Sequence, residues 1–122
     1  MKLQLQGQRM RLRLDEAELA RLLAGDTIVN ATELGTRLHF SQWLGLYAGT
    51  APTLQATPGE WRLQLPEAAV RDYVGRLPCR DALGFELDMD GSAAVSLHFE
   101  VDVRDSLQVR GPRRRRSGQQ PG

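Results

Sequence analysis

Two histidines, His39 and His98, are the side chains of this sequence best suited to acid–base chemistry or to metal binding. Each lies in a Leu-His-Phe triplet, so we expect the two histidines at equivalent places in two similar halves of the chain. A pseudo-two-fold axis between the halves would bring them together, with Arg11 and Arg62 beside them. These four residues are the candidate ligand-binding residues. The alternative interpretation is that both histidines are exposed on the polar sides of their strands and bind nothing.

Alternating charges form a second pattern. Arg9, Arg11 and Arg13 alternate with apolar residues along one predicted strand. Four acidic residues alternate in the same way along the last predicted hairpin, namely Glu86, Asp88, Glu100 and Asp102. Such charge ladders bind polyphosphate and metal in the triphosphate tunnel enzymes, but this chain has Gln4 and Gln6 where that family has glutamates on its first strand. We therefore expect a solvated face with cross-strand ion pairs.

Two other clusters each lack a residue that their chemistry requires. Residues 88–91, Asp-Met-Asp-Gly, resemble a calcium-binding loop, but Leu97 stands where that loop needs a bidentate glutamate, so a hairpin turn is expected instead. Cys79 is the single cysteine, and neither histidine is near it in sequence to act as a base. The sequence therefore predicts no catalytic residue, no metal site and no cofactor.

The C-terminal segment is strongly basic. Before position 110 the chain has 11 basic and 15 acidic residues, a net charge of −4, whereas the remainder carries +5. Residues 108–122 offer almost no apolar side chain to bury, so we expect a disordered Arg-rich tail there. Its run of four arginines is a candidate contact for nucleic acid or another anion: Arg113, Arg114, Arg115 and Arg116. Attachment of the tail to the acidic face of the body is the alternative.

The sequence pattern of the elements that position these residues occurs twice in the chain. With a shift of 51 positions, Leu3-Gln4 recurs as Leu54-Gln55, Arg11-Leu12-x-Leu14 as Arg62-Leu63-x-Leu65, and Glu16-Ala17 as Glu67-Ala68. The triplets at 38–40 and 97–99 are 59 apart, which predicts about eight additional residues in the second unit near 77–83. We predict one duplicated domain at residues 1–107, with repeat one at 1–48 and repeat two at 53–107.

Each repeat is expected to read strand–strand–helix–strand–strand. Alternation predicts a hairpin of residues 2–6 and 9–14, Asp15 and Glu18 form a capping box for the following helix, and Gly25 ends it. Strands near 27–33 and 37–44 follow, and residues 45–52 are read as a connector. The fold class is α+β: a mostly antiparallel, barrel-like sheet, or two facing sheets, with two helices.

Composition indicates a soluble protein. The 122 residues are 41% hydrophobic and 25% charged, and no segment approaches the roughly 20 apolar residues of a membrane-spanning helix. A single cysteine and the lack of a signal-peptide pattern predict a cytoplasmic location. Arginine outnumbers lysine fifteen to one, which is typical of a GC-rich bacterial genome.

The opening of the chain resembles a family of short bacterial proteins of unknown function. The resemblance covers mainly residues 1–45 and lies in Met-Lys-Leu-x-Leu-x-Gly-x-x-Met-Arg-Leu-Arg-Leu, with Leu-His-Phe at 38–40. It implies a strand–turn–strand start with basic residues alternating along the second strand. It implies no activity.

The sequence as a whole predicts a small non-enzymatic binding or protein-interaction module of the bacterial cytoplasm. It would form a homodimer through an edge strand or bind a partner protein. One alternative is a small-ligand or metal-binding barrel, including an enzyme, built around the four candidate residues. Another is a nucleic-acid-associated protein that acts through the Arg-rich tail.

Overall fold

The computed structural model of the chain describes residues 1–78, 80–89 and 93–103. Cys79, the turn expected at Asp90-Gly91 and the tail with its run of arginines lie outside these residues. The described chain forms ten elements: β1 (Lys2–Gln6), β2 (Arg9–Asp15), α1 (Glu16–Leu23), β3 (Ile28–Leu34), β4 (Leu38–Tyr47), β5 (Thr53–Thr57), β6 (Glu60–Pro66), α2 (Glu67–Gly75), β7 (Leu83–Leu87) and β8 (Val95–Asp102).

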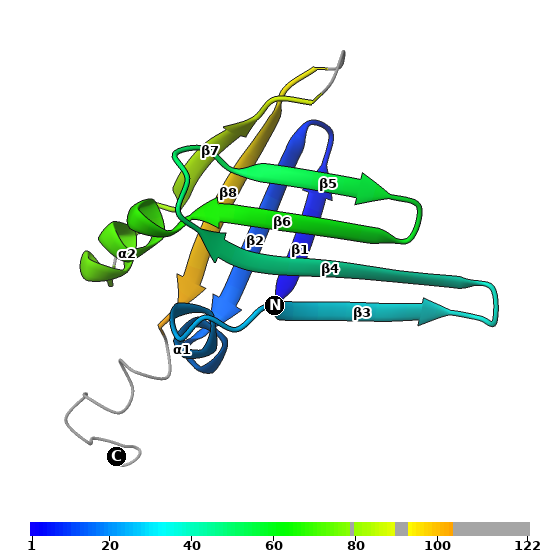
Figure 1. Cartoon of the computed structure of the whole chain (residues 1–122), viewed down its shortest axis with the longest axis horizontal. Helices are drawn as coiled ribbons and strands as arrows, with labels where there is room; N and C mark the ends of the chain where they lie inside the picture. The colour runs from blue at the N-terminus through cyan, green and yellow to red at the C-terminus, as the bar shows by residue number, and fades with distance from the viewer. Residues whose placement is uncertain (79, 90–92, 104–122) are drawn as a thin grey trace.

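The strands form two sheets of four, so the fold is α+β as predicted (Figure 1). Sheet A has the order β1-β2-β8-β7 and sheet B the order β3-β4-β6-β5. Neighbours in both sheets are antiparallel except for the central pairs, β2 with β8 and β4 with β6, which are parallel. The prediction of a barrel-like sheet is wrong, because among the described residues no ladder joins a strand of sheet A to a strand of sheet B. The alternative of two sheets is the one observed.

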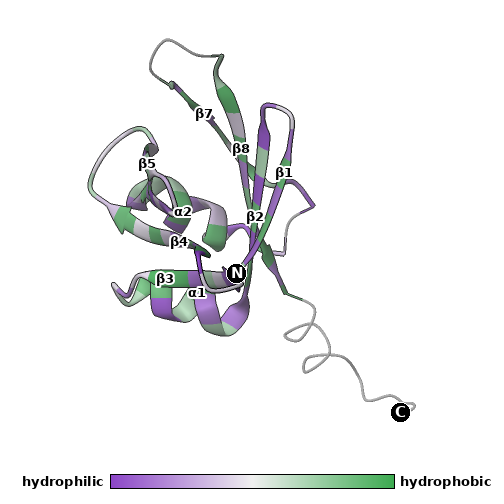
Figure 2. Ribbon diagram, turned by 90° about the vertical axis from the view of Figure 1, so that its right-hand side faces the viewer, coloured by the Kyte–Doolittle hydropathy of each residue, from purple (hydrophilic) through white to green (hydrophobic). Residues whose placement is uncertain are grey.

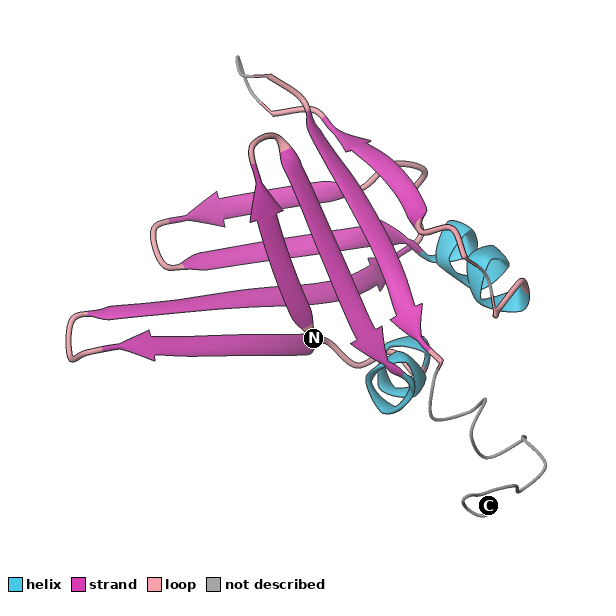
Figure 3. Cartoon of the chain, turned by 180° about the vertical axis from the view of Figure 1, so that it is seen from behind, coloured by secondary structure: helices cyan, strands magenta, loops and turns pink. Residues whose placement is uncertain are grey.

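The two sheets pack face to face with their strands running across one another (Figures 1 and 3). Viewed side-on they are two separate layers (Figure 2). Alternation along each strand sends one set of apolar residues into the space between the layers. The most deeply buried of these core residues are Leu14, Ile28, Leu44, Leu65, Leu97 and Phe99.

The two helices complete the core. Helix α1 buries Leu19 and Leu22 against strands of both sheets. Helix α2 buries Val70 and Tyr73, and the Tyr73 ring meets Phe99 of β8 edge-on with centroids 6.1 Å apart. Burial of such side chains stabilises the fold by about 1.5–3 kcal/mol each relative to exposure. Each helix directly follows the second strand of a hairpin, β2 or β6, so the chain itself brings it to the core.

Local signals in the sequence place the helix ends. The Asp15 side chain accepts a hydrogen bond from the Glu18 backbone N–H at 2.7 Å, and Glu18 accepts one from the Asp15 backbone N–H at 3.1 Å. This is the predicted capping box, and it satisfies two N–H groups that the helix itself leaves without partners. Helix α2 has no such side-chain cap, because its N-cap residue is Pro66, whose side chain has no hydrogen-bond acceptor.

Strand β4 is longer than its sequence predicts. We read residues 45–52 as a connector, but Gly45, Leu46 and Tyr47 continue the strand. They pair in parallel register with Gln64, Leu65 and Pro66 of β6. The neighbouring strand therefore overrides the turn preference of Gly45. As a result β4, with ten residues, is the longest of the described strands, and β8 has eight.

The pairing registers define which positions of the two sheets are equivalent. Bounds of β1 and β2 recur in β5 and β6 with the shift of 51. In sheet B, Ile28 pairs with Leu44, and in sheet A, Leu83 pairs with Phe99. Both residues of the second pair lie 55 positions after those of the first, so β3 and β4 correspond to β7 and β8 with a shift of 55. The two halves therefore differ by four residues between helix and strand, and the predicted eight is wrong.

Candidate functional site

The two histidines lie on different sheets. His98 is on β8 and points to the outer face of sheet A, whereas His39 is near the start of β4 on the outer face of sheet B. Because the inner faces of the sheets pack together, the outer faces point in opposite directions. By the pairing register the position equivalent to His98 is Trp43, since both lie opposite equivalent arginines, Arg11 and Arg62. The Leu-His-Phe recurrence therefore does not mark equivalent positions.

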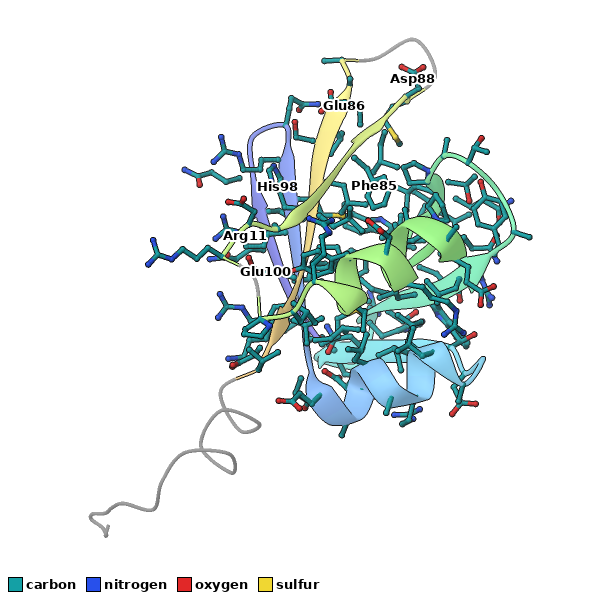
Figure 4. All side chains as sticks on the ribbon, turned by 90° about the vertical axis from the view of Figure 1, so that its left-hand side faces the viewer. Arg11, Phe85, Glu86, Asp88, His98 and Glu100 are labelled. Carbon is teal, nitrogen blue, oxygen red and sulfur yellow. The ribbon has the colours of Figure 1, made fainter. Side chains whose placement is uncertain are left out.

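The structure brings His98 and Arg11 together as opposite residues of β8 and β2. Gln4 of β1 and Gly84 of β7 lie in the same row across sheet A. Figure 4 shows Arg11, His98 and Glu100 on the strands of sheet A, with Glu86 on β7 and Asp88 just beyond the end of that strand. This half of the predicted ligand set is thus a local cluster on an open sheet face.

Arg62 and His39, the other half of the predicted ligand set, lie on sheet B. The guanidinium of Arg62 lies 4.3 Å from the ring centroid of Trp43, and its Nε donates to Glu60 at 2.7 Å. The indole N–H of Trp43 in turn donates to the Ser41 hydroxyl at 3.1 Å. Stacking and the ion pair hold the Arg62 side chain flat on sheet B. His39 lies beyond this cluster, opposite Glu33 in the exposed part of β4.

Among the described residues no group of three or more His, Cys, Asp or Glu side chains could hold a metal ion. No helix in that part of the chain is long and apolar enough to cross a membrane. What the described chain offers instead is two surfaces, a basic face on sheet A and an apolar hairpin on sheet B.

The basic face consists of four cations on the outer side of β1 and β2: Lys2, Arg9, Arg11 and Arg13. Beside it the surface is hollowed into a concavity of about 640 Å³, whose lining includes Lys2, Arg11, Arg13 and Asn30. A second hollow of about 250 Å³ lies at Arg9 and Arg11. The alternating arginines in the sequence predicted the basic strand, but only the fold gives the hollow surface around it.

The apolar hairpin is formed by the end of β3 and the start of β4. Both strands reach past the edge strand β1, so all residues from 31 to 39 are exposed (Figures 1 and 3). Leu34 and Leu38, which lie opposite one another, are 61% and 56% exposed. Sequence reasoning missed this surface, because Leu38 continues the alternation of Gln42 and Leu44, which are buried in β4.

Comparison of the chain with protein-family models, with curated proteins and with solved structures finds no match. The two surfaces must therefore be interpreted from their own chemistry.

Proposed function

We propose that this protein is a small non-enzymatic interaction module that forms a homodimer through strand β3. The observation that carries the proposal is the projecting β3–β4 hairpin, with exposed Leu34 and Leu38 beside a free strand edge. An edge strand presents a row of unpaired N–H and C=O groups, and proteins normally protect it with proline, lysine, a bulge or short length.

Strand β3 has none of these protections. Its sequence, Ile-Val-Asn-Ala-Thr-Glu-Leu, contains one charged residue and pairs with β4 without interruption over seven residues. The other edge strands, β1, β5 and β7, have five residues each, and β1 carries Lys2. Strand β3 is therefore the edge of the described sheets best able to accept another strand.

A second copy is the partner that this edge fits. Antiparallel pairing about Ala31 would place Val29 opposite Glu33 of the other copy, and Ile28 opposite Leu34 of the other copy. Side chains on one face of sheet B would then continue on the same face of the partner's sheet. The two sheets B would join into one eight-stranded sheet, and each Leu34 would gain an apolar neighbour.

The test places a cysteine on the proposed axis. In the Cys79→Ser background, Ala31→Cys should form an intermolecular disulfide on mild oxidation, because opposite residues of antiparallel strands have Cα atoms about 4.5–5.5 Å apart. The matched control, Ala20→Cys, places an exposed cysteine on helix α1, outside the strand edge that is proposed to pair. Equal cross-linking of the two variants would contradict the proposed pairing.

The oligomeric state gives an independent readout. Wild-type protein should elute as a dimer in size-exclusion chromatography with light scattering, and Leu34→Ser/Leu38→Ser should elute as a monomer. Leu5→Ser is the control, since Leu5 is 54% exposed but lies on β1. A monomeric wild-type protein at the concentrations of these experiments would disprove the homodimer, as would dissociation by Leu5→Ser alone.

The equivalent registers of the two sheets also support our proposal that the chain arose by duplication of a strand–strand–helix–strand–strand unit. Hairpins β1–β2 and β5–β6 have the same bounds after the shift of 51, and each pairs in parallel with the last strand of the other half. Each half of the chain thus contributes one hairpin to each sheet. We therefore expect that neither half folds alone, which separate expression of residues 1–48 would test by circular dichroism.

A further inference from the structure

From the basic face of sheet A we infer a binding site for an extended, phosphate-bearing polyanion. This inference goes beyond the proposed homodimer, because the outer face of sheet A is a different surface from the edge of β3. Three arginines occupy alternate positions of β2, and Lys2 lies opposite Arg13 on β1. Alternate residues of a strand are about 6.6–6.8 Å apart on one face, so the three guanidinium groups form a ladder.

Two of the three arginines are free to bind. Among the described residues Arg13 pairs with Glu100 at 2.8 Å, whereas Arg9 and Arg11 make no ion pair and no side-chain hydrogen bond. Both arginines line the hollow of about 250 Å³, together with Gln4, Leu5 and Gln6. An unpaired arginine presents a planar fork of donors that fits phosphate oxygens two at a time.

Charge is separated across this face. The β1–β2 half carries the four cations, while the β8–β7 half carries Glu86, Glu100 and Asp102. The chain before position 110 is acidic overall, with 11 basic and 15 acidic residues. A basic stripe on an otherwise acidic body attracts an anion to the stripe, because the rest of the surface repels it.

The chemistry of the neighbouring side chains favours phosphate groups over an acidic peptide. Around the arginines the outer face presents the amides of Gln4, Gln6 and Gln8, the Ser96 hydroxyl and the His98 imidazole, and it has no Phe, Tyr or Trp side chain among the described residues. Such a wet surface offers little apolar area for peptide side chains. For base stacking the described part of this face offers no Phe, Tyr or Trp ring, only the imidazole of His98. Binding should therefore follow the charge of the phosphate chain, whether that chain is inorganic polyphosphate or the backbone of a single-stranded nucleic acid.

The experiment measures binding of the full-length protein to a fluorescein-labelled oligothymidylate by polarisation at several salt concentrations, with inorganic polyphosphate as competitor. The variant Arg9→Gln/Arg11→Gln should bind about tenfold more weakly. It should also reduce the salt slope, which is the magnitude of the slope of log K against log salt concentration, by about 1.4, or about 0.7 for each phosphate that the variant no longer binds. Polyphosphate should displace the oligonucleotide from the wild-type protein. Displacement by polyglutamate at the same charge concentration would assign the face to acidic peptides and overturn the inference.

Two control variants separate the site from net charge. Arg21→Gln/Arg76→Gln removes the same charge from exposed positions on or next to the helices and should change affinity by no more than about twofold. The quadruple variant Arg113→Gln/Arg114→Gln/Arg115→Gln/Arg116→Gln tests the C-terminal arginines. Equal losses in the first control and in Arg9→Gln/Arg11→Gln would overturn the inference. So would binding that depends on the C-terminal arginines alone, or an oligonucleotide that polyphosphate fails to displace.

Discussion

Arg13 and Glu100 lie opposite one another on the parallel strands β2 and β8, and the Nε and Nη2 groups of Arg13 both donate to Oε1 of Glu100, at 3.1 and 2.8 Å. The two residues are 87 positions apart in sequence and join the first hairpin to the last strand. The cross-strand ion pair that the charge ladders predicted is thus confirmed at this position. It also neutralises one of the three arginines of the ladder.

Removal of the Glu100 charge should separate the contribution of the ion pair to stability from its neutralisation of Arg13. Glu100→Gln should cost less than about 1 kcal/mol of unfolding free energy, because the Arg13 side chain is 42% exposed and its ion pair is screened by water. The same variant should raise the salt slope of polyanion binding by about 0.7, since Arg13 becomes free to contact a phosphate. Urea denaturation and the polarisation assay measure the two quantities. Weaker polyanion binding by Glu100→Gln would contradict the expected role of Arg13.

The hydrogen-bonded pair Asn30 and Gln42 of sheet B should show strong energetic coupling in stability measurements. Asn30 donates to the Gln42 side-chain oxygen at 2.8 Å, and Gln42 is only 7% exposed. Gln42→Leu should destabilise the protein by about 1–3 kcal/mol, because it leaves the Asn30 amide without its partner. Asn30→Leu/Gln42→Leu should recover most of this loss, since the equivalent pair in sheet A, Phe85 and Leu97, is apolar. Additive effects in a double-mutant cycle would show that the pair is not coupled.

The aromatic contact between α2 and β8 should be a major source of stability. Phe99 is fully buried and Tyr73 is 1% exposed. Phe99→Ala should lower the unfolding free energy by about 3–5 kcal/mol, through reduced burial and the cavity left behind. Val29→Ala is the control, because Val29 is 46% exposed and its truncation should cost under about 1 kcal/mol. Similar losses for the two variants in urea denaturation would contradict the position of Phe99 in the core.

The turn between β5 and β6 should require glycine. Gly59 has a φ of +89°, and a Cβ there would lie 3.2 Å from the His39 carbonyl oxygen. Gly59→Ala should therefore cost about 1–3 kcal/mol. Gly84→Ala is the matched control, since Gly84 lies within β7, has no positive φ, and a Cβ there would meet no atom within 4 Å. Thermal unfolding should show a loss for Gly59→Ala and little change or a gain for Gly84→Ala.

The capping box of α1 should contribute measurably to stability. Asp15→Ala removes the acceptor for the Glu18 backbone N–H and should cost about 1 kcal/mol. Asp26→Ala, which alters an exposed acidic residue just after the same helix, should cost less than half of this amount. Equal effects in urea denaturation would show that net charge, rather than the cap, determines the change.

Local features of this protein followed from the sequence alone. Alternation in residues 2–14 determined a hairpin and the face that it buries, and Asp15 with Glu18 determined the start of α1, because these patterns depend only on neighbours along the chain. The observed bounds of β5 and β6 lie 51 positions after those of β1 and β2, the same shift as the recurrence in the sequence. The ladder of arginines on β2 was visible for the same reason.

Only the tertiary structure decided what these elements form together. Parallel pairing of β2 with β8 and of β4 with β6 joins strands that are distant in sequence, and no local pattern specifies such a partner. That pairing places His39 and His98 on opposite faces, joins Arg13 to Glu100, and extends β4 through Gly45. It also leaves Leu34 and Leu38 beyond the core, because burial depends on where the other sheet ends.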